Sequence, residues 1–203
     1  LVMPGKLLQR KTNTVVGGRV KDLPQDIKSE WGSLVSELAE AGSIFFPRST
    51  VPPRQGAVNP LLVGFGDGSL EGFCAMVYAV WPRPAGGAEV FLVMAKSRVS
   101  PLGGTTTVPR MEISSAALLS RLALLVARVC GFTPVEIVMA LDSECSVSAL
   151  TRYKGLLKPY FAHRAAEVNE AVKELQNLCP SVNPMVAIPG EENPANIGTR
   201  SRA

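Results

Sequence analysis

The chain has 203 residues, of which 46% are hydrophobic and 19% are charged, and its formal net charge is +4 at pH 7. These values predict a folded domain with a substantial core and a smaller appendage, and they exclude an intrinsically disordered chain. The small positive charge permits a polyanionic partner without establishing one, because an ordinary solvated surface has the same balance.

The four cysteines are far apart and include no C-x-x-C pair, so the sequence indicates neither a zinc site nor a disulfide framework. A reducing compartment fits this pattern. The longest apolar run, residues 113–132, is interrupted by Arg121 and Arg128 and does not predict a membrane span. The chain shows no signal peptide and begins with Leu1, so we expect a fragment of a longer polypeptide.

The first predicted element is a helix over residues 24–41, where apolar side chains recur on one face. Pro24 lies near its start and Gly42 follows its end. Residues 46–60 contain four prolines, which cannot sustain a helix or a central strand. They indicate a linker and a domain boundary.

Three runs rich in Val, Phe, Tyr and Leu follow the linker, and the short turn-rich segments between them predict an antiparallel meander. These runs cover residues 60–68, 72–81 and 88–99. A helix over about 109–130 and a strand over 134–142 come next. Two helices, a strand and a last helical turn complete the chain, at residues 145–153, 160–178, 185–190 and 193–200. This order predicts an α/β domain without an internal repeat.

Glu112 lies on the predicted buried face of the helix at 109–130. On a wheel of 100° per residue, Leu119 and Val126 fall close to Glu112, whereas Arg121 and Arg128 fall on the opposite side. An acidic residue in a first turn often faces solvent and only complements the helix dipole. An inward-facing position argues against that explanation.

Two aspartates end predicted strands: Asp67 ends the first, and Asp142 ends the strand at 134–142. Either aspartate alone would most often cap a helix or form a turn. If the two strands are adjacent and parallel, however, both aspartates lie at one edge of the sheet, where open α/β sheets build their sites. Together with Glu112 they would form a cluster of three carboxylates.

Three carboxylates that meet at one edge repel one another unless cations neutralise them. Mg²⁺ prefers carboxylate and water oxygens as ligands. Two such ions can activate a water and stabilise the leaving oxygen in phosphodiester cleavage. The three acids therefore predict a divalent-metal site.

Other chemistries have less support. The single histidine, His163, lies on a predicted helix without a neighbouring nucleophile or ligand cluster, which argues against a Ser-His-Asp or zinc-water mechanism. The glycines of the segment GFGDGS match neither the P-loop nor the dinucleotide-binding pattern.

The order of these acids, followed by a final Asn-Pro-Ala-Asn turn, resembles the ribonuclease H domain of retroelement polymerases. Five segments narrow this resemblance to the BEL/Pao group of long-terminal-repeat retrotransposons: AKSRVSPL, VPRMEI, LDSECSVSAL, KPYFAHRAAEV and IPGEENPANIGTR. The helix at 24–41, followed by FFPRS, is similar to the connection segment that joins reverse transcriptase to ribonuclease H in that group. The resemblance covers nearly the whole chain.

The resemblance implies an α/β, ribonuclease H-like fold. Its sheet would be mixed and five-stranded, with three antiparallel strands plus two parallel ones, flanked by helices and preceded by a small N-terminal helical appendage. The implied domains are the end of the connection segment at 1–50, a Pro-rich linker at 51–59 and a ribonuclease H-like domain at 60–203.

The implied activity is hydrolysis of the RNA strand of RNA/DNA hybrids with two Mg²⁺ ions, or with Mn²⁺ in their place. By resemblance, the catalytic and metal-binding residues are Asp67, Glu112 and Asp142, and the fourth acid of the family falls at Asn196. An amide keeps a neutral oxygen but loses the charge, so the second metal should bind more weakly and turnover should fall. Integrases of the same broad fold place their glutamate last, whereas here it comes second.

The implied partners are an RNA/DNA hybrid and a covalently linked reverse transcriptase domain, and no membrane partner is expected. The candidate nucleic-acid-binding residues are Ser69, Lys96, Arg98, Arg110 and Ser143. The expected location is a retroelement particle in the cytoplasm, or the nucleus.

Two alternatives remain open at this point. One is a catalytically silent ribonuclease H-like module with a structural or nucleic-acid-binding role, which Asn196 favours. The other is an unrelated α/β protein in which the three acids are only helix caps and turn formers.

Overall fold

The structure is a computed structural model that describes residues 2–16, 23–45, 49–52, 58–103, 106–151 and 157–199. The helices are α1 (Val2–Val16), α2 (Gln25–Ala41), α3 (Val108–Val129), α4 (Glu144–Thr151) and α5 (Pro159–Leu178). The strands are β1 (Leu61–Gly68), β2 (Gly72–Pro82), β3 (Ala88–Val99), β4 (Glu136–Leu141) and β5 (Val182–Ala187). Two short 3₁₀ turns follow, η2 (Gly190–Glu192) and η3 (Pro194–Gly198).

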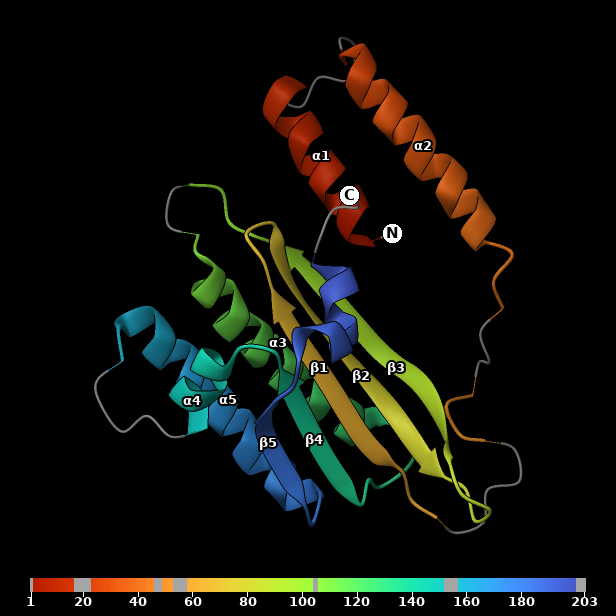
Figure 1. Cartoon of the computed structure of the whole chain (residues 1–203), viewed down its shortest axis with the longest axis vertical. Coiled ribbons are helices and arrows are strands. Elements are labelled where there is room, and N and C mark those ends of the chain that lie inside the picture. Colours follow the sequence, from red (N-terminus) through yellow and green to blue (C-terminus); the bar gives the residue numbers. More distant parts are fainter. Residues whose placement is uncertain are drawn as a thin grey trace.

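The five strands form one mixed sheet in the order β3-β2-β1-β4-β5 (Figure 1). Strand β2 pairs antiparallel with both β1 and β3, whereas β4 pairs parallel with both β1 and β5. This arrangement confirms the predicted sheet of three antiparallel and two parallel strands. It also confirms that the strands ending near Asp67 and Asp142 are neighbours.

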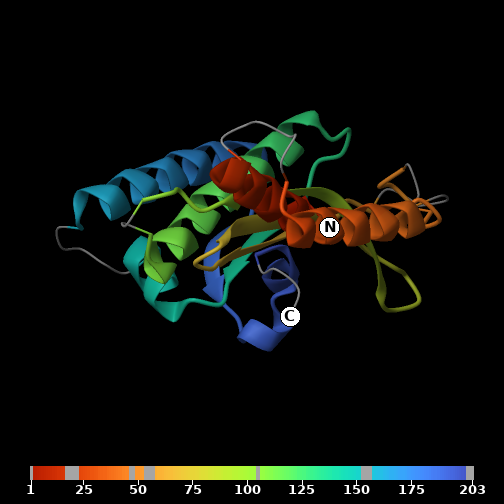
Figure 2. The ribbon, with the colours of Figure 1, turned by 90° about the horizontal axis from the view of Figure 1, so that it is seen from above.

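Two layers cover the sheet. Helices α3 and α5 lie on one face, and the C-terminal 3₁₀ turns lie on the other (Figure 2). The core fills the space between α3, α5 and the sheet, and its largest fully buried side chains include Leu62, Val77, Leu119, Val126, Ile137, Met139, Leu141 and Leu175. Arg121 and Arg128 are exposed on α3, as the wheel predicts.

The end of β1 touches the first turn of α3. A Cβ atom added to Gly68 would lie 2.3 Å from both the main-chain nitrogen of Glu112 and the carbonyl carbon of Met111. Only a residue without a side chain permits this approach. The contact fixes where α3 begins relative to the edge of the sheet.

Helix α1 is not among the elements that the sequence predicts. Leu8 on this helix packs with Ile27 and Leu34 of α2. Helix α1 also lies against β3, where Lys6 donates to the main-chain oxygen of Ser97 and Arg10 donates to that of Ser100 at 3.0 Å. The appendage is therefore a pair of helices that is attached to the sheet through α1.

The predicted linker at 51–59 lies partly outside the described residues, since 53–57 are not among them. Just before it, the indole nitrogen of Trp81 donates to the main-chain oxygen of Thr50 at 2.7 Å, which ties this segment to β2. The division into three domains stays a prediction.

Two C-terminal elements differ from the expected ones. Strand β5 begins at Val182, three residues before the predicted start, and includes Pro184, which an edge strand tolerates because one side of it needs no ladder hydrogen bonds. The last helical turn is 3₁₀ rather than α. Positions 152 and 153 of the predicted helix 145–153 lie outside the described residues. In the part of the chain that the structure describes, no helix combines the length and apolarity needed to cross a membrane.

Candidate active site

Asp67 and Asp142 lie at the same edge of the sheet. The parallel ladder of β1 and β4 ends with the pair Gly66 and Leu141. Asp67 and Asp142, the next residues, therefore lie side by side at the end of this ladder. Asp67 is 6% exposed, and Asp142 is half-buried at the start of the turn into α4. The parallel pairing brings the two aspartates to one edge of the sheet, as expected for two adjacent parallel strands that each end in an aspartate.

Glu112 reaches this edge from the first turn of α3. Its Oε2 atom accepts hydrogen bonds from the hydroxyls of Ser143, at 2.6 Å, and Ser146, at 3.2 Å. The Ser143 hydroxyl also accepts from the main-chain nitrogen of Ser146 at 3.3 Å, as an N-cap does. The first turn of α4 therefore holds the Glu112 carboxylate beside Asp142.

The C-terminal turn η3 closes the other side of the edge. Fully buried Thr199 donates from its hydroxyl to Oδ2 of Asp67, and the Ser69 hydroxyl donates to the main-chain oxygen of Thr199 at 2.8 Å. Asn193, which is 3% exposed, donates from its amide to the main-chain oxygen of Gly66 at 3.0 Å. These bonds fix η3 against the end of β1.

Asn196 lies on η3, between Asn193 and Thr199. Its amide nitrogen donates to the main-chain oxygen of Gly190 at 2.7 Å. Its Oδ1 atom is buried and makes no hydrogen bond. A buried oxygen without a donor costs free energy, and such atoms are rare in folded proteins.

The acids influence one another electrostatically. Burial and the charge of Asp67 raise the pKa of Asp142, with a smaller contribution from Glu112, while an Asn193 hydrogen bond opposes the rise. Cys74, which pairs with Asp67 across β1 and β2, has its thiol pKa raised to about 11 by burial and by the same Asp67 charge. Negative charge is thus concentrated where β1 and β4 end.

The donor set suits a hard divalent cation, because it consists of oxygens: three carboxylates and the unpartnered amide oxygen of Asn196. In the described ranges, no three His, Cys, Asp or Glu side chains form a ready-made group for a metal ion. Instead, one carboxylate oxygen of Glu112 accepts hydrogen bonds from the hydroxyls of Ser143 and Ser146. One carboxylate oxygen of Asp67 accepts a hydrogen bond from the hydroxyl of Thr199. Metal binding by Asp67, Glu112, Asp142 and Asn196 stays a prediction.

The five candidate nucleic-acid-binding residues lie on different elements, and their role stays a prediction. Ser69 and Ser143 have structural partners, as described above. Lys96 and Arg98 are exposed on β3, but they alternate with Ser97, whose cross-strand neighbours are Cys74 and then Asp67. Lys96 and Arg98 therefore point to the face of the sheet opposite Asp67. Arg110 lies in the first turn of α3, two residues before Glu112.

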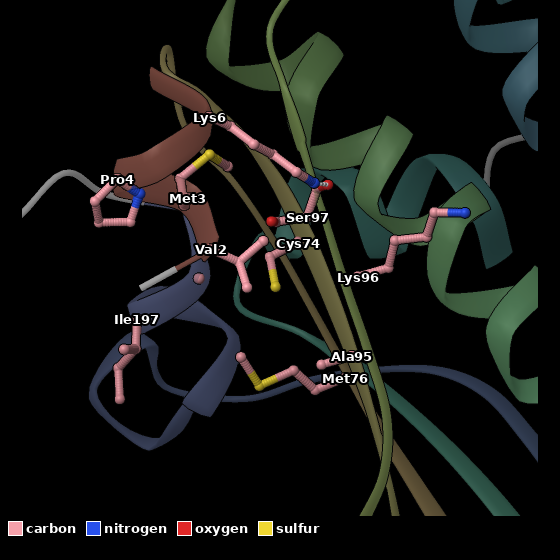
Figure 3. Close-up of a pocket in the computed structure, with 11 residues that line it drawn as sticks. Val2, Met3, Pro4, Lys6, Cys74, Met76, Ala95, Lys96, Ser97 and Ile197 are labelled. Atoms are coloured by element: carbon pink, nitrogen blue, oxygen red, sulfur yellow. Dashed lines mark hydrogen bonds between the residues drawn. The ribbon is translucent and has the colours of Figure 1, made fainter. Parts of the chain in front are cut away.

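A cavity of about 280 Å³ lies between α1, β2, β3 and η3 (Figure 3). Cys74, Lys96 and Ser97 are among the residues that line it, and the Lys96 side chain extends outward. None of the four predicted metal ligands lines this cavity. The candidate active site is instead the open edge formed by the ends of β1 and β4.

Sequence reasoning missed the residues that hold the acids in place: Asn193, Thr199 and Ser146. Asn193 carried a usable signal, because an Asn directly before Pro194 is typical of the N-cap of a helical turn. Thr199 carried none, since its bond to Asp67 joins residues 132 positions apart.

The raised pKa of Asp142 leads to a stability prediction. The pKa of Asp142 is higher in the folded protein than in the unfolded chain. Such an acid stabilises the folded state at a pH below its pKa in the unfolded chain, and this contribution is lost as the pH rises through its pKa in the folded protein. We therefore expect Asp142→Asn to raise the melting temperature at pH 7 by about 1–2 °C, because the half-buried charge is removed. Thermal unfolding at pH 7 and pH 4 tests this: the gain should shrink at pH 4, and an equal gain at both values would contradict the electrostatic cause.

A family model described as "Pao retrotransposon-like RNaseH-like domain" matches residues 1–143, which include Asp67, Glu112 and Asp142 but not Asn196. No curated protein sequence matches the chain.

Several solved structures of ribonucleases H are similar to this chain at low sequence identity. RNase H1 from the halophilic archaeon Halobacterium salinarum NRC-1 is 18% identical, with a TM-score of 0.42, and the match covers 67% of this chain and 89% of that one. The N-terminal RNase H domain of a Mycobacterium tuberculosis protein is 14% identical, with a TM-score of 0.44 and coverages of 66% and 92%. LC11-RNase H1, solved in complex with an RNA/DNA hybrid, is 16% identical, with a TM-score of 0.45 and coverages of 68% and 91%.

Proposed function

The chain belongs to the family of Pao retrotransposon-like RNaseH-like domains, and from that membership we propose that it cleaves the RNA strand of RNA/DNA hybrids. Its fold is ribonuclease H-like, with the mixed sheet described above. The observation that carries the proposal is the parallel pairing of β1 and β4, which brings Asp67 and Asp142 to one edge beside Glu112.

In this proposal, Asp67, Glu112 and Asp142 hold two Mg²⁺ ions, or Mn²⁺ in their place, and Asn196 contributes its unpartnered amide oxygen. The ions, when bound, supply the positive charge that lowers the pKa of a water and stabilises the leaving oxygen of the phosphodiester. Ser143 and Ser146 orient the Glu112 carboxylate.

Thr199 has the same orienting role for Asp67, since its hydroxyl donates to one carboxylate oxygen and leaves the other for a cation. Thr199 and Asn196 are both on or next to η3, so the turn couples the two ligands. A firmly held carboxylate loses less conformational freedom when it binds a ligand, and such supporting bonds raise metal affinity.

The proposed substrate is a hybrid duplex, recognised through phosphates, 2′-hydroxyls and shape more than through base edges. The proposed context is a retroelement polyprotein with a covalently linked reverse transcriptase, located in a cytoplasmic particle or in the nucleus. Membership in a retrotransposon family supports this context.

Asn196→Asp tests the assignment of the fourth ligand. Asp cannot donate to the main-chain oxygen of Gly190 as Asn196 does, so the variant should be less stable without metal. It should reach half-maximal hybrid cleavage at a Mg²⁺ concentration about tenfold lower, because a charged ligand replaces a neutral one. A labelled hybrid incubated over a range of Mg²⁺ and Mn²⁺ concentrations gives both values.

A second candidate function is a catalytically silent ribonuclease H-like module, and Asn196 is the observation that favours it. No hybrid cleavage by either the wild type or Asn196→Asp would support that module. Calorimetry that detects no divalent-metal binding by either protein would favour acids that serve only as caps and turn residues.

A further inference from the structure

The cavity between α1, β2, β3 and η3 has the size and the lining of a small-molecule site (Figure 3). Its volume of about 280 Å³ is close to the lower limit for ligand pockets, about 300 Å³. Its apolar lining comes from three parts of the fold: Val2, Met3 and Pro4 of α1, Met76 and Ala95 of the sheet, and Ile197 of η3. The space therefore suits a molecule the size of a single substituted aromatic ring.

Two polar side chains, Cys74 of β2 and Ser97 of β3, line the same cavity and are partners across the two strands. Ser97 is 6% exposed, and its hydroxyl makes no hydrogen bond within the described part of the chain. The Cys74 thiol donates only weakly, at 3.9 Å, to the main-chain oxygen of Ala75. A buried hydroxyl without a partner costs free energy and is rare, so Ser97 gives the wall a hydrogen-bonding group that a ligand can use.

Met3 is the adaptable part of this wall. The Ser97 oxygen is buried, so a ligand reaches it only after a neighbouring side chain shifts. Met3 lines the same cavity, and an unbranched thioether side chain changes its conformation easily. Such side-chain rearrangements are common on binding even where the backbone stays in place.

Charges of both signs flank the polar pair. Lys6 donates from its ammonium group to the main-chain oxygen of Ser97, whereas Asp67 pairs with Cys74 across β1 and β2. A charged ligand of either sign would lie near a like charge and would also lose its hydration in an apolar cavity. A neutral ligand avoids both costs.

We propose that this cavity binds a small neutral molecule with an apolar body and one hydroxyl group, which pairs with the hydroxyl of Ser97. Binding there requires neither a metal ion nor nucleic acid, so it is independent of the proposed function. The bound molecule contacts α1, the sheet and η3, and thereby holds the turn that carries Asn196 against the sheet. Because it binds the folded chain, it also stabilises that state.

Methionine-methyl NMR of the full chain locates the ligand. Met3 and Met76 line the cavity, whereas Met139 and Met185 belong to the core under α3 and α5. Benzyl alcohol should shift the methyl signals of Met3 and Met76 and leave those of Met139 and Met185 unchanged. Its dissociation constant should be on the order of 1 mM, as expected for a ligand of about eight non-hydrogen atoms.

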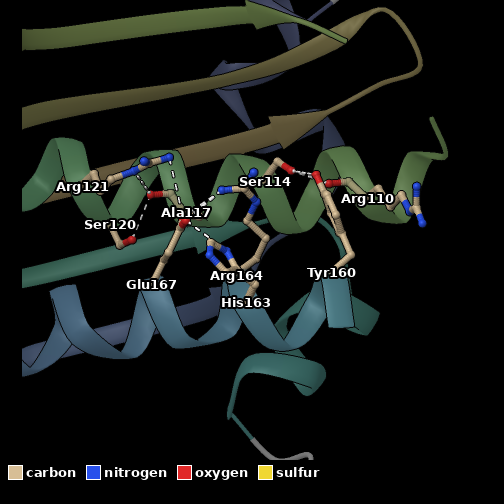
Figure 4. Close-up of polar contacts among 9 residues, drawn as sticks. All are labelled: Arg110, Ser114, Ala117, Ser120, Arg121, Tyr160, His163, Arg164 and Glu167. Carbon is tan, nitrogen blue, oxygen red and sulfur yellow. Dashed lines mark hydrogen bonds and ion pairs between the residues drawn. The ribbon is translucent and has the colours of Figure 1, made fainter. Parts of the chain in front are cut away.

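Two further probes and one variant identify the hydrogen bond. Ser97→Ala should weaken the binding of benzyl alcohol by about three- to tenfold and leave the binding of toluene, which has no hydroxyl, unchanged. Benzoate, which carries a negative charge, should bind more weakly than benzyl alcohol. Ser120→Ala is the matched control and should leave every affinity unchanged, because Ser120 is fully buried on α3 and its hydroxyl donates to the main-chain oxygen of Ala117 at 3.2 Å (Figure 4).

Unchanged signals of Met3 and Met76 at about twentyfold the expected dissociation constant of benzyl alcohol would overturn the proposal. Equal shifts at all four methionines would also overturn it, because they indicate non-specific partition into the protein. So would equal losses of benzyl alcohol and toluene binding in Ser97→Ala, or benzoate binding as tight as that of benzyl alcohol. Melting temperatures show that each variant is folded, and Ser97→Ala should melt no lower than the wild type, since it removes an unpartnered hydroxyl.

Discussion

Asp67→Asn is expected to lower the rate of hybrid cleavage by about 100-fold or more, the scale at which removal of one preorganised electrostatic group acts on catalysis. Asp67 is the most buried of the three acids, at 6% exposed, and its charge reaches both Asp142 and Cys74. Loss of its charge removes the larger of the two charge effects that raise the pKa of Asp142 and, in the proposed function, one carboxylate ligand for a cation. The measurement is single-turnover cleavage of a labelled hybrid at saturating Mg²⁺.

The fold should survive this substitution. An asparagine amide oxygen can still accept the hydrogen bond that Thr199 donates to Asp67. Asp26→Asn is a suitable control, because Asp26 lies on α2 with an exposed side chain and a 3.8 Å contact with Lys11. Cleavage by Asp67→Asn at the rate of Asp26→Asn would refute the role of Asp67.

Gly68→Ala should have the second large effect, on stability and activity together. The new Cβ would lie 2.3 Å from main-chain atoms of Met111 and Glu112, and main-chain atoms cannot rotate away as a side chain can. Overpacking of this kind costs about 1–3 kcal/mol, which corresponds to a fall of roughly 2–10 °C in melting temperature. Because the first turn of α3 must move, Glu112 leaves the edge of the sheet and cleavage should fall by up to about 100-fold.

Gly32→Ala provides the matched comparison for this prediction. Gly32 lies within α2, and a Cβ added there meets nothing within 4 Å. The substitution should stabilise the protein by about 0.5–1 kcal/mol, because alanine loses less backbone entropy in a helix. The same change in melting temperature for both glycine variants, measured by calorimetry, would contradict the close approach of α3 to Gly68.

The sheet could be predicted from the sequence because its strands are strongly patterned. Alternating burial along β1 and β2 comes directly from side chains that alternate between the faces of a strand, and the short turns between β1, β2 and β3 leave only antiparallel pairing. The convergence of Asp67 and Asp142 then depended on a single assumption, that β1 and β4 are parallel neighbours. The ladder confirms it.

Features that depend on distant contacts could not be predicted in this way. Helix α1 buries Met3 and Leu8 against parts of the chain that lie far along the sequence, and its own sequence includes Pro4 and Gly5, which weaken a helical pattern. The contact of Tyr160 with Arg110 likewise joins two helices that only the packed core brings together. Periodicity describes what one segment buries, but not which partner it meets.

The attachment of α1 has a consequence for how the sheet is protected. Strand β3 is an outer strand, and an outer strand with free main-chain oxygens is a template on which further chains can assemble. Lys6 donates to one such oxygen, that of Ser97, and Arg10 donates to the main-chain oxygen of Ser100 just past the end of the strand. Met3 packs close to Gly72, at the start of the adjoining strand. We expect α1 to limit edge-to-edge association at β3, and a chain trimmed to the predicted domain boundary at residue 60 to lose that protection.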